Sequence, residues 1–149
     1  MEIERKYLVH HDLWAAVQKP NPKIIKQGYL YKDKEKSVRI RIKDQKGYIT
    51  IKSSVSVISR EEFEYEIPLA DAEKMLKLTC PKVLSKKRFE IPYLKHLIEV
   101  DVFEGKLEGL IVAEIELKDE NEEIYLPIWI DKEVSDDQNY LNVHLIELC

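Results

Sequence analysis

The sequence has few cysteines, no long apolar run and no large excess of charge of one sign. Its two cysteines, Cys80 and Cys149, lack metal-type spacing, so we interpret both as reduced thiols and expect no disulfide framework. No apolar run reaches membrane-spanning length, and the acidic N-terminus is unlike a signal peptide. These absences predict a soluble, cytoplasmic protein without a membrane partner.

Charged residues are abundant but nearly balanced. They make up 35% of the 149 residues, and 28 acids against 24 bases leave a formal net charge of −4. Because a duplex-binding protein would show a uniformly basic face, we expect no nucleic acid partner. The length fits a single domain over residues 1–149 with one sizeable core.

Alternation of polar and apolar residues predicts a mainly antiparallel β protein with flanking helices. Strand-like segments lie at 2–9, 24–31, 38–43, 48–52, 62–67, 82–91, 94–103 and 109–118, with a turn at 45–47. Helical spacing predicts helices at 11–18, 69–78 and 137–148, the last with Leu141, Leu145 and Leu148 facing inward. A sheet of about eight strands favours closure into an antiparallel β-barrel, which removes its edges.

Charges of one sign recur at every second residue of single strands. Because side chains alternate between the two faces of a strand, Glu2, Glu4 and Lys6 share one face. The acidic sets are Glu2/Glu4, Glu62/Glu64/Glu66, Glu99/Asp101 and Glu114/Glu116, and the basic sets are Arg39/Arg41/Lys43 and Lys86/Arg88. In most of these segments the residues of the opposite parity are apolar.

Two arrangements fit this pattern. In the commoner one, the aliphatic residues fill the barrel and the charges face water. In the other, the charges line the lumen and helices cover an apolar outer face. Strands of a single sign favour the second arrangement, because a solvated face usually mixes signs to gain cross-strand pairs. A charged lumen needs compensation: arginines suit phosphate, and carboxylates suit Mg²⁺ or Mn²⁺, so the pattern points to a metal-bearing polyphosphate.

The ordered segments resemble those of the triphosphate tunnel metalloenzymes, or CYTH family. Glu2-Ile3-Glu4-Arg5-Lys6 matches the ExExK motif that marks the family's N-terminus. Segments that look like family strands follow in family order at 27–30, 38–41, 51–52, 62–67, 86–88, 99–103 and 113–117. The resemblance therefore covers nearly the whole chain, and it implies an eight-stranded tunnel that acts on triphosphates with a divalent cation.

Site residues follow from the resemblance position by position. It implies metal-facing carboxylates at Glu2, Glu4, Glu62, Glu64, Asp101, Glu114 and Glu116. It implies phosphate-binding side chains at Lys6, Arg39, Arg41, Lys52, Lys86 and Arg88, with Tyr29 as a further candidate. Glu4, Arg41 and Lys86 are the catalytic candidates among them.

We therefore expect Mg²⁺- or Mn²⁺-dependent hydrolysis of a triphosphate, with inorganic tripolyphosphate giving pyrophosphate and phosphate. The inorganic substrate is favoured by the resemblance to short bacterial members and by the lack of a segment that plainly holds a base. The alternatives are an adenylyl cyclase, a nucleoside or thiamine triphosphatase of the same family, and a non-catalytic barrel that binds polyphosphate or RNA. A homodimer stays open at this stage.

Overall fold

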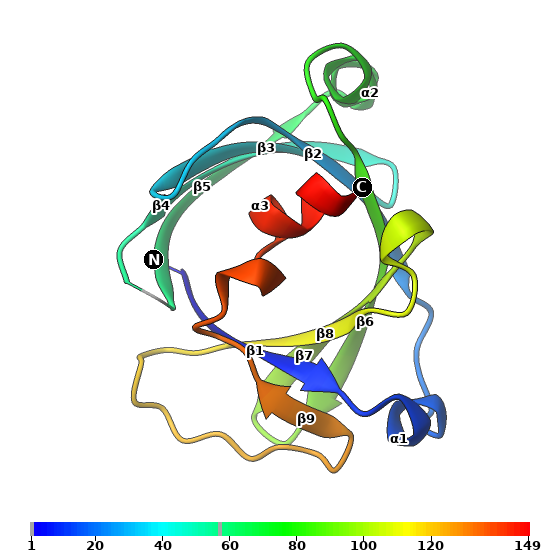
Figure 1. Cartoon of the computed structure of the whole chain (residues 1–149), viewed down its shortest axis with the longest axis vertical. Coiled ribbons are helices and arrows are strands. Elements are labelled where there is room, and N and C mark those ends of the chain that lie inside the picture. Colours follow the sequence, from blue (N-terminus) through cyan, green and yellow to red (C-terminus); the bar gives the residue numbers. More distant parts are fainter. Residues whose placement is uncertain (1, 57) are drawn as a thin grey trace.

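The structure, a computed structural model, describes residues 2–56 and 58–149 (Figure 1). In this part of the chain, one sheet contains β1 (Glu2–Val9), β2 (Lys23–Lys32), β3 (Lys36–Lys43), β4 (Lys46–Ser54), β5 (Ser59–Ile67), β6 (Leu84–Tyr93), β7 (His96–Phe103), β8 (Ile111–Glu116) and β9 (Ile130–Glu133). The strand order is β5-β4-β3-β2-β6-β7-β8-β1-β9, and β5 also pairs with β1. The closed, eight-stranded antiparallel barrel is thus confirmed, with β9 as an extra strand.

β1 joins the two ends of the sheet. Its residues 4–8 pair with residues 112–116 of β8. On the other edge of β1, residues 2 and 3 pair with residues 59 and 60 of β5, and residues 7 and 9 pair with residues 133 and 130 of β9. The seam between β1 and β5 is short, so closure of the barrel depends on the first residues of the chain.

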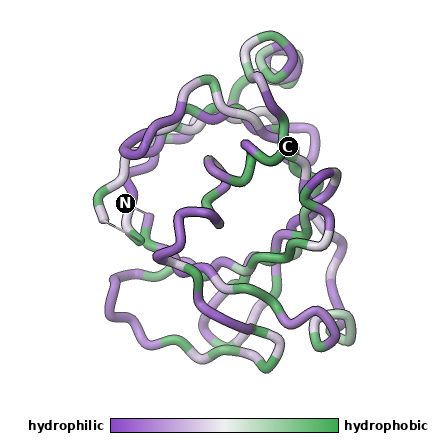
Figure 2. The backbone as a smooth tube through the Cα atoms, in the orientation of Figure 1, coloured by the Kyte–Doolittle hydropathy of each residue, from purple (hydrophilic) through white to green (hydrophobic). Residues whose placement is uncertain are grey.

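Helices cover apolar patches on the outside of the barrel (Figure 1). α2 (Leu69–Leu78) spans the predicted range and packs Ala72 and Leu76 against Ile40 of β3. α1 (His11–Ala15) is shorter than the predicted 11–18, and its Trp14 packs against Trp129 with ring centroids 5.0 Å apart. The two tryptophans lie on a larger cluster of aliphatic residues from β1, β7 and β8. Figure 2 shows hydrophobic and hydrophilic residues interspersed along the strands, and in these regions apolar side chains of the strands pack under the helices.

The C-terminal residues do not form the single helix predicted for 137–148. They form three short pieces, η2 (Gln138–Tyr140), α3 (Asn142–Leu145) and η3 (Ile146–Leu148), which cross the inside of the barrel (Figure 1). Two local features break the helix: Asp137 accepts from the backbone N–H of Asn139, and Leu141 is extended.

Apolar side chains of the C-terminal segment fill one end of the lumen. Leu145 and Ile146 are buried with Tyr29, Phe103 and Leu107, which belongs to η1 (Gly105–Leu107). Leu148, by contrast, is 63% exposed, so its predicted inward position is wrong. The barrel interior is therefore divided into an apolar end and a charged remainder.

The turn between β3 and β4 lies one residue earlier than the predicted 45–47. Asp44 and Gln45 have φ values of 48° and 69°, as a two-residue hairpin turn with positive φ at both positions requires. Gly47 lies within β4 instead, and a Cβ there would be 2.6 Å from the Cβ of Ala72. The glycine is needed for the close approach of α2, not for the turn.

In the described residues, no helix is long and apolar enough to cross a membrane.

Candidate active site

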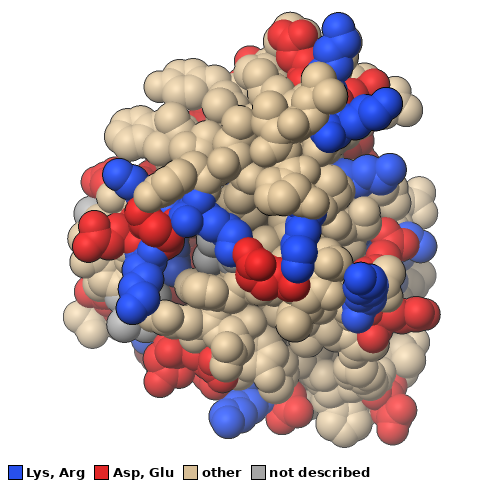
Figure 3. Space-filling model, turned by 45° about the horizontal axis from the view of Figure 1, so that its top comes forward, with Lys and Arg blue, Asp and Glu red and all other residues tan. Residues whose placement is uncertain are grey.

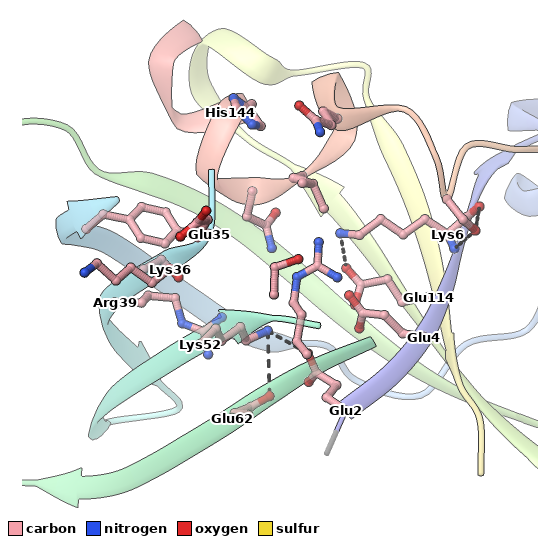
Figure 4. A pocket seen from close by; sticks show the side chains of 18 of the residues that line it. Glu2, Glu4, Lys6, Glu35, Lys36, Arg39, Lys52, Glu62, Glu114 and His144 are labelled. Carbon is pink, nitrogen blue, oxygen red and sulfur yellow. Dashed lines mark hydrogen bonds and ion pairs between the residues drawn. The ribbon is translucent and has the colours of Figure 1, made fainter. Parts of the chain in front are cut away.

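A cavity of about 400 Å³ lies in the charged part of the lumen (Figure 4). Of the residues predicted for the site, its wall includes Glu2, Glu4, Lys6, Tyr29, Arg39, Arg41, Lys52, Glu62, Glu64, Arg88, Glu114 and Glu116. Figure 3 shows charges of both signs gathered beside a hollow in the surface. The second arrangement considered above, with charges inside, is the one that the structure has.

Two predicted residues, Lys86 and Asp101, lie behind this wall. The Lys86 Nζ donates to Asp101 Oδ2 at 2.6 Å, and both side chains are almost completely buried. Arg88 donates to both oxygens of the same carboxylate, from Nε at 2.8 Å and from Nη2 at 2.9 Å. Asp101 is thus held by two cations, and its role as a metal ligand stays a prediction.

Burial shifts the pKa values of Asp101 and Lys86 in opposite directions, because it disfavours the charged form of each. Burial alone would raise the pKa of Asp101, but the charges of Arg88 and Lys86 hold it well below its usual range. Burial lowers the pKa of Lys86 to about 7, against the pull of Asp101. The catalytic role of Lys86 also stays a prediction.

Glu4, Lys6 and Glu114 form the centre of the acidic wall. Lys6 and Glu114 lie opposite each other on β1 and β8, and Lys6 Nζ donates to Glu114 Oε1 at 2.9 Å. Burial and the charge of Glu114 raise the pKa of Glu4 to about 8. Against the effect of burial, Lys6 holds the pKa of Glu114 well below its ordinary value. One acid is therefore ionised and the other keeps its proton near neutral pH.

The seam of the barrel carries a second group of ion pairs. Lys52 Nζ of β4 lies 2.9 Å from Glu2 Oε1 and 3.7 Å from Glu62 Oε2, which links three strands (Figure 4). Arg39 Nη2 lies 3.6 Å from Glu64 Oε1. The pairs of Lys52 thus link β4 to the two strands of the seam, and the pair of Arg39 joins β3 to β5 beside it.

Arg41 is held in a different way. Its Nε and Nη2 donate to Gln27 Oε1 at 2.8 and 2.6 Å, and Gln27 is its direct cross-strand neighbour on β2. Burial and the charges of Arg39 and Arg88 lower the pKa of Arg41 to about 9. Repulsion from other bases, rather than attraction to an acid, dominates the charge environment of Arg41.

The cavity wall also includes residues to which the sequence assigned no role. Lys43 and Glu99 belong to the predicted charge sets, so the alternation of charge could have identified them. The C-terminal segment adds Gln138, Asn142 and His144, and the connection between β2 and β3, together with the start of β3, adds residues 33–37. The polar C-terminal residues carry no periodic signal, because they reach the lumen through the irregular path of the segment.

The donor set fits a divalent cation that arrives with phosphate. Glu4 lies opposite Glu116 and Glu114 opposite Lys6, so carboxylates from two adjacent strands share this wall. Among the described residues, no three acids, histidines or cysteines already converge as a metal cluster. Mg²⁺ commonly binds through one or two carboxylates together with waters and substrate phosphates, which needs no preformed protein cage.

A family model described as the CYTH domain matches residues 1–145. The chain belongs to the CYTH family. It is 44% identical, over 98% of its length and 93% of the relative's, to an inorganic triphosphatase of Acetivibrio thermocellus. It is also 31% identical, over 95% of its length and 93% of the relative's, to an inorganic triphosphatase of Nitrosomonas europaea.

Solved structures of the family share this fold. The crystal structure of an inorganic triphosphatase superposes with a TM-score of 0.69 at 28% identity, over 98% of this chain and 94% of that one. A putative adenylate cyclase of Bacillus halodurans gives a TM-score of 0.63 at 21% identity, over 80% and 82% of the two chains. The second likeness shows the common barrel alone.

Proposed function

We propose that this CYTH protein is an inorganic triphosphatase, which hydrolyses tripolyphosphate to pyrophosphate and phosphate. The observation that carries the proposal is the lumen cavity, whose wall combines bases from β3, β4 and β6 with acids of β1 and β8. The high similarity to two inorganic triphosphatases over nearly the full length supports this substrate over the alternatives within the family.

The bases of the cavity serve to bind and orient the phosphate chain. Phosphoryl transfer depends on positioning and on neutralising charge more than on covalent chemistry by the protein. Arg39 and Arg41 are buried on one strand and line the cavity, and Lys52 lies nearby on β4. Guanidinium groups can donate two parallel hydrogen bonds to a phosphate, so the arginines fix its orientation as well as its charge.

The acids would hold the metal, which we propose to be Mg²⁺ or Mn²⁺. Glu4, Glu114 and Glu116 are the best placed ligands, because they face the cavity from adjacent strands. A bound cation would supply charge neutralisation and a more acidic water. Lys6 keeps Glu114 ionised and oriented, and Glu4 must give up its proton before it can coordinate.

A screen of phosphate release tests the substrate. The protein would be assayed with tripolyphosphate, ATP, pyrophosphate and thiamine triphosphate, each with Mg²⁺, with Mn²⁺ and with a chelator, while cyclic AMP is measured in parallel. We expect the highest kcat/KM with tripolyphosphate and no turnover with chelator. Cyclic AMP from ATP would indicate a cyclase, and tight polyphosphate or RNA binding without turnover would indicate a binding barrel.

We further propose that the protein acts in the cytoplasm, which its free cysteines Cys80 and Cys149 support. That the protein acts without nucleic acid or a membrane stays a prediction, and whether it forms a homodimer stays open.

A further inference from the structure

Arg41 differs from the other buried bases of the barrel in the charge of its partner. Lys6 has Glu114, Lys86 and Arg88 share Asp101, and Arg39 has Glu64, each within 4.0 Å. Of the five buried bases in residues 2–56 and 58–149, only Arg41 has no carboxylate at salt-bridge distance. Its guanidinium is held by the neutral amide of Gln27.

The geometry of Gln27 is that of a support for Arg41. Oε1 accepts from two nitrogens of the guanidinium, which fixes both the position and the plane of the group. The amide lies completely buried, and its Nε2 has no hydrogen-bond partner among the described residues. Rotating the amide by 180° would place Nε2 against the donors of Arg41, so the orientation with Oε1 toward Arg41 is enforced despite the unpaired N–H.

The neutrality of this support has an electrostatic consequence. A carboxylate in the same place would hold Arg41 as firmly, but it would cancel the charge that attracts phosphate. Arg88, on β6 and two strands away in the sheet, shows that case, because Asp101 accepts from two of its nitrogens and neutralises it. The two arginines look equivalent in the sequence, and the difference between them lies in the residue that holds each one.

We propose that Gln27 is a positioning residue that orients Arg41 toward the cavity while leaving its positive charge available to the triphosphate. The inference rests on the proposed function, since it assigns Arg41 as a phosphate ligand. Gln27 itself does not line the cavity, so it acts through Arg41 and not on the substrate.

The test is Gln27→Glu, which keeps the shape and the two hydrogen bonds but adds a negative charge. We expect a folded protein whose kcat/KM for tripolyphosphate falls about 100-fold, the size of effect seen when one transition-state donor is lost. The dissociation constant for tripolyphosphate, measured by calorimetry without metal, should rise as well. If the amide serves only the fold, this variant keeps its activity and its affinity, and the proposal is overturned.

Two controls separate this effect from a general gain of negative charge or a loss of folding. Gln138→Glu makes the same change at an exposed position on the cavity wall, and it should cost far less. Gln27→Met, nearly isosteric but without an acceptor, should lower kcat/KM about 10-fold because Arg41 loses its anchor. Wild-type activity in a folded Gln27→Met variant would also overturn the proposal.

A double-mutant cycle shows whether Gln27 acts through Arg41. In an Arg41→Ala background, Gln27→Glu should change kcat/KM less than threefold, because the guanidinium through which position 27 acts is gone. Additive losses would show that Gln27 acts independently and would refute the role. A wild-type protein without triphosphatase activity would instead refute the proposed function, so the two failures are distinguishable.

Discussion

Replacing Glu4 by glutamine tests how the acids of β1 and β8 share the cavity. Glutamine keeps the shape of the side chain but cannot coordinate a hard divalent cation as a carboxylate does. We expect Glu4→Gln to remove most metal-dependent turnover and to leave the barrel intact. The same change should also stabilise the metal-free protein, since it removes a carboxylate that burial and Glu114 disfavour.

The size of this stabilisation follows from the pKa of Glu4. The pKa rises from 4.5 to about 8 on folding, so the folded protein binds the proton more tightly, and stability falls as the pH rises through this window. At about 1.4 kcal/mol per unit, the full cost above pH 8 is at most about 5 kcal/mol. Glu4 lies on the wall of an open cavity, so solvent screening reduces this to roughly 2–3 kcal/mol.

Thermal melting without metal measures the effect. At pH 8 and above, Glu4→Gln should melt roughly 5–10 °C above the wild type, on the scale of about 2–4 °C per kcal/mol for this size. Near pH 5 the two proteins should melt at similar temperatures. Glu66→Gln makes the same change at an exposed position of β5 and should alter neither melting nor turnover.

Two results would contradict this reasoning. A variant with wild-type turnover at ordinary Mg²⁺ would show that Glu4 is not a metal ligand. Equal melting temperatures of the wild type and Glu4→Gln across the pH range would show that the ionised Glu4 carboxylate does not destabilise the metal-free protein.

Three further predictions concern the cavity, the seam and α2. Arg41→Ala should raise the dissociation constant for tripolyphosphate at least tenfold more than Lys43→Ala, because Arg41 is buried and Lys43 is partly solvated and screened; equal, small effects measured by calorimetry would argue against the lumen site. Deleting residues 1–4, with an initiator Met supplied, should abolish phosphate release and lower the melting temperature, since the pairing of β1 with β5 is lost; a truncated protein that stays active would rule out Glu2 and Glu4 as ligands. Gly47→Ala should destabilise the protein by about 1–3 kcal/mol in denaturant titration, because its Cβ would meet Ala72, and unchanged stability would show that α2 can shift without cost.

The strands and the direction of their charged faces could be predicted from the sequence because both depend on a period of two. Glu2, Glu4 and Lys6 all face the cavity as expected. Charges of one sign along single strands predicted this inward direction correctly, whereas the general rule that charged faces point to water did not. Local spacing also predicted α2, because all the apolar residues that define the buried face of this helix lie within one short segment of the sequence.

Features that depend on contacts between distant residues could not be predicted in this way. Asp101 alternates like a cavity acid, but pairing across β6 and β7 places it under Arg88 and Lys86. Gln27 is a single neutral residue and carries no pattern, so its role depends on its register with Arg41. The path of residues 137–148 depends on the space left inside a closed barrel, which no local rule describes.

The pairing of β1 has a consequence for how the chain folds as it is synthesised. β1 pairs chiefly with residues 112–116, more than a hundred positions later, so it leaves the ribosome well before this partner. At about 5–20 residues per second, β1 waits roughly 5–20 s for its main partner. An unpaired strand is a template for aggregation, and charges along a strand oppose it. Glu2, Glu4 and Lys6 place such charges on β1 for the time that it is unpaired.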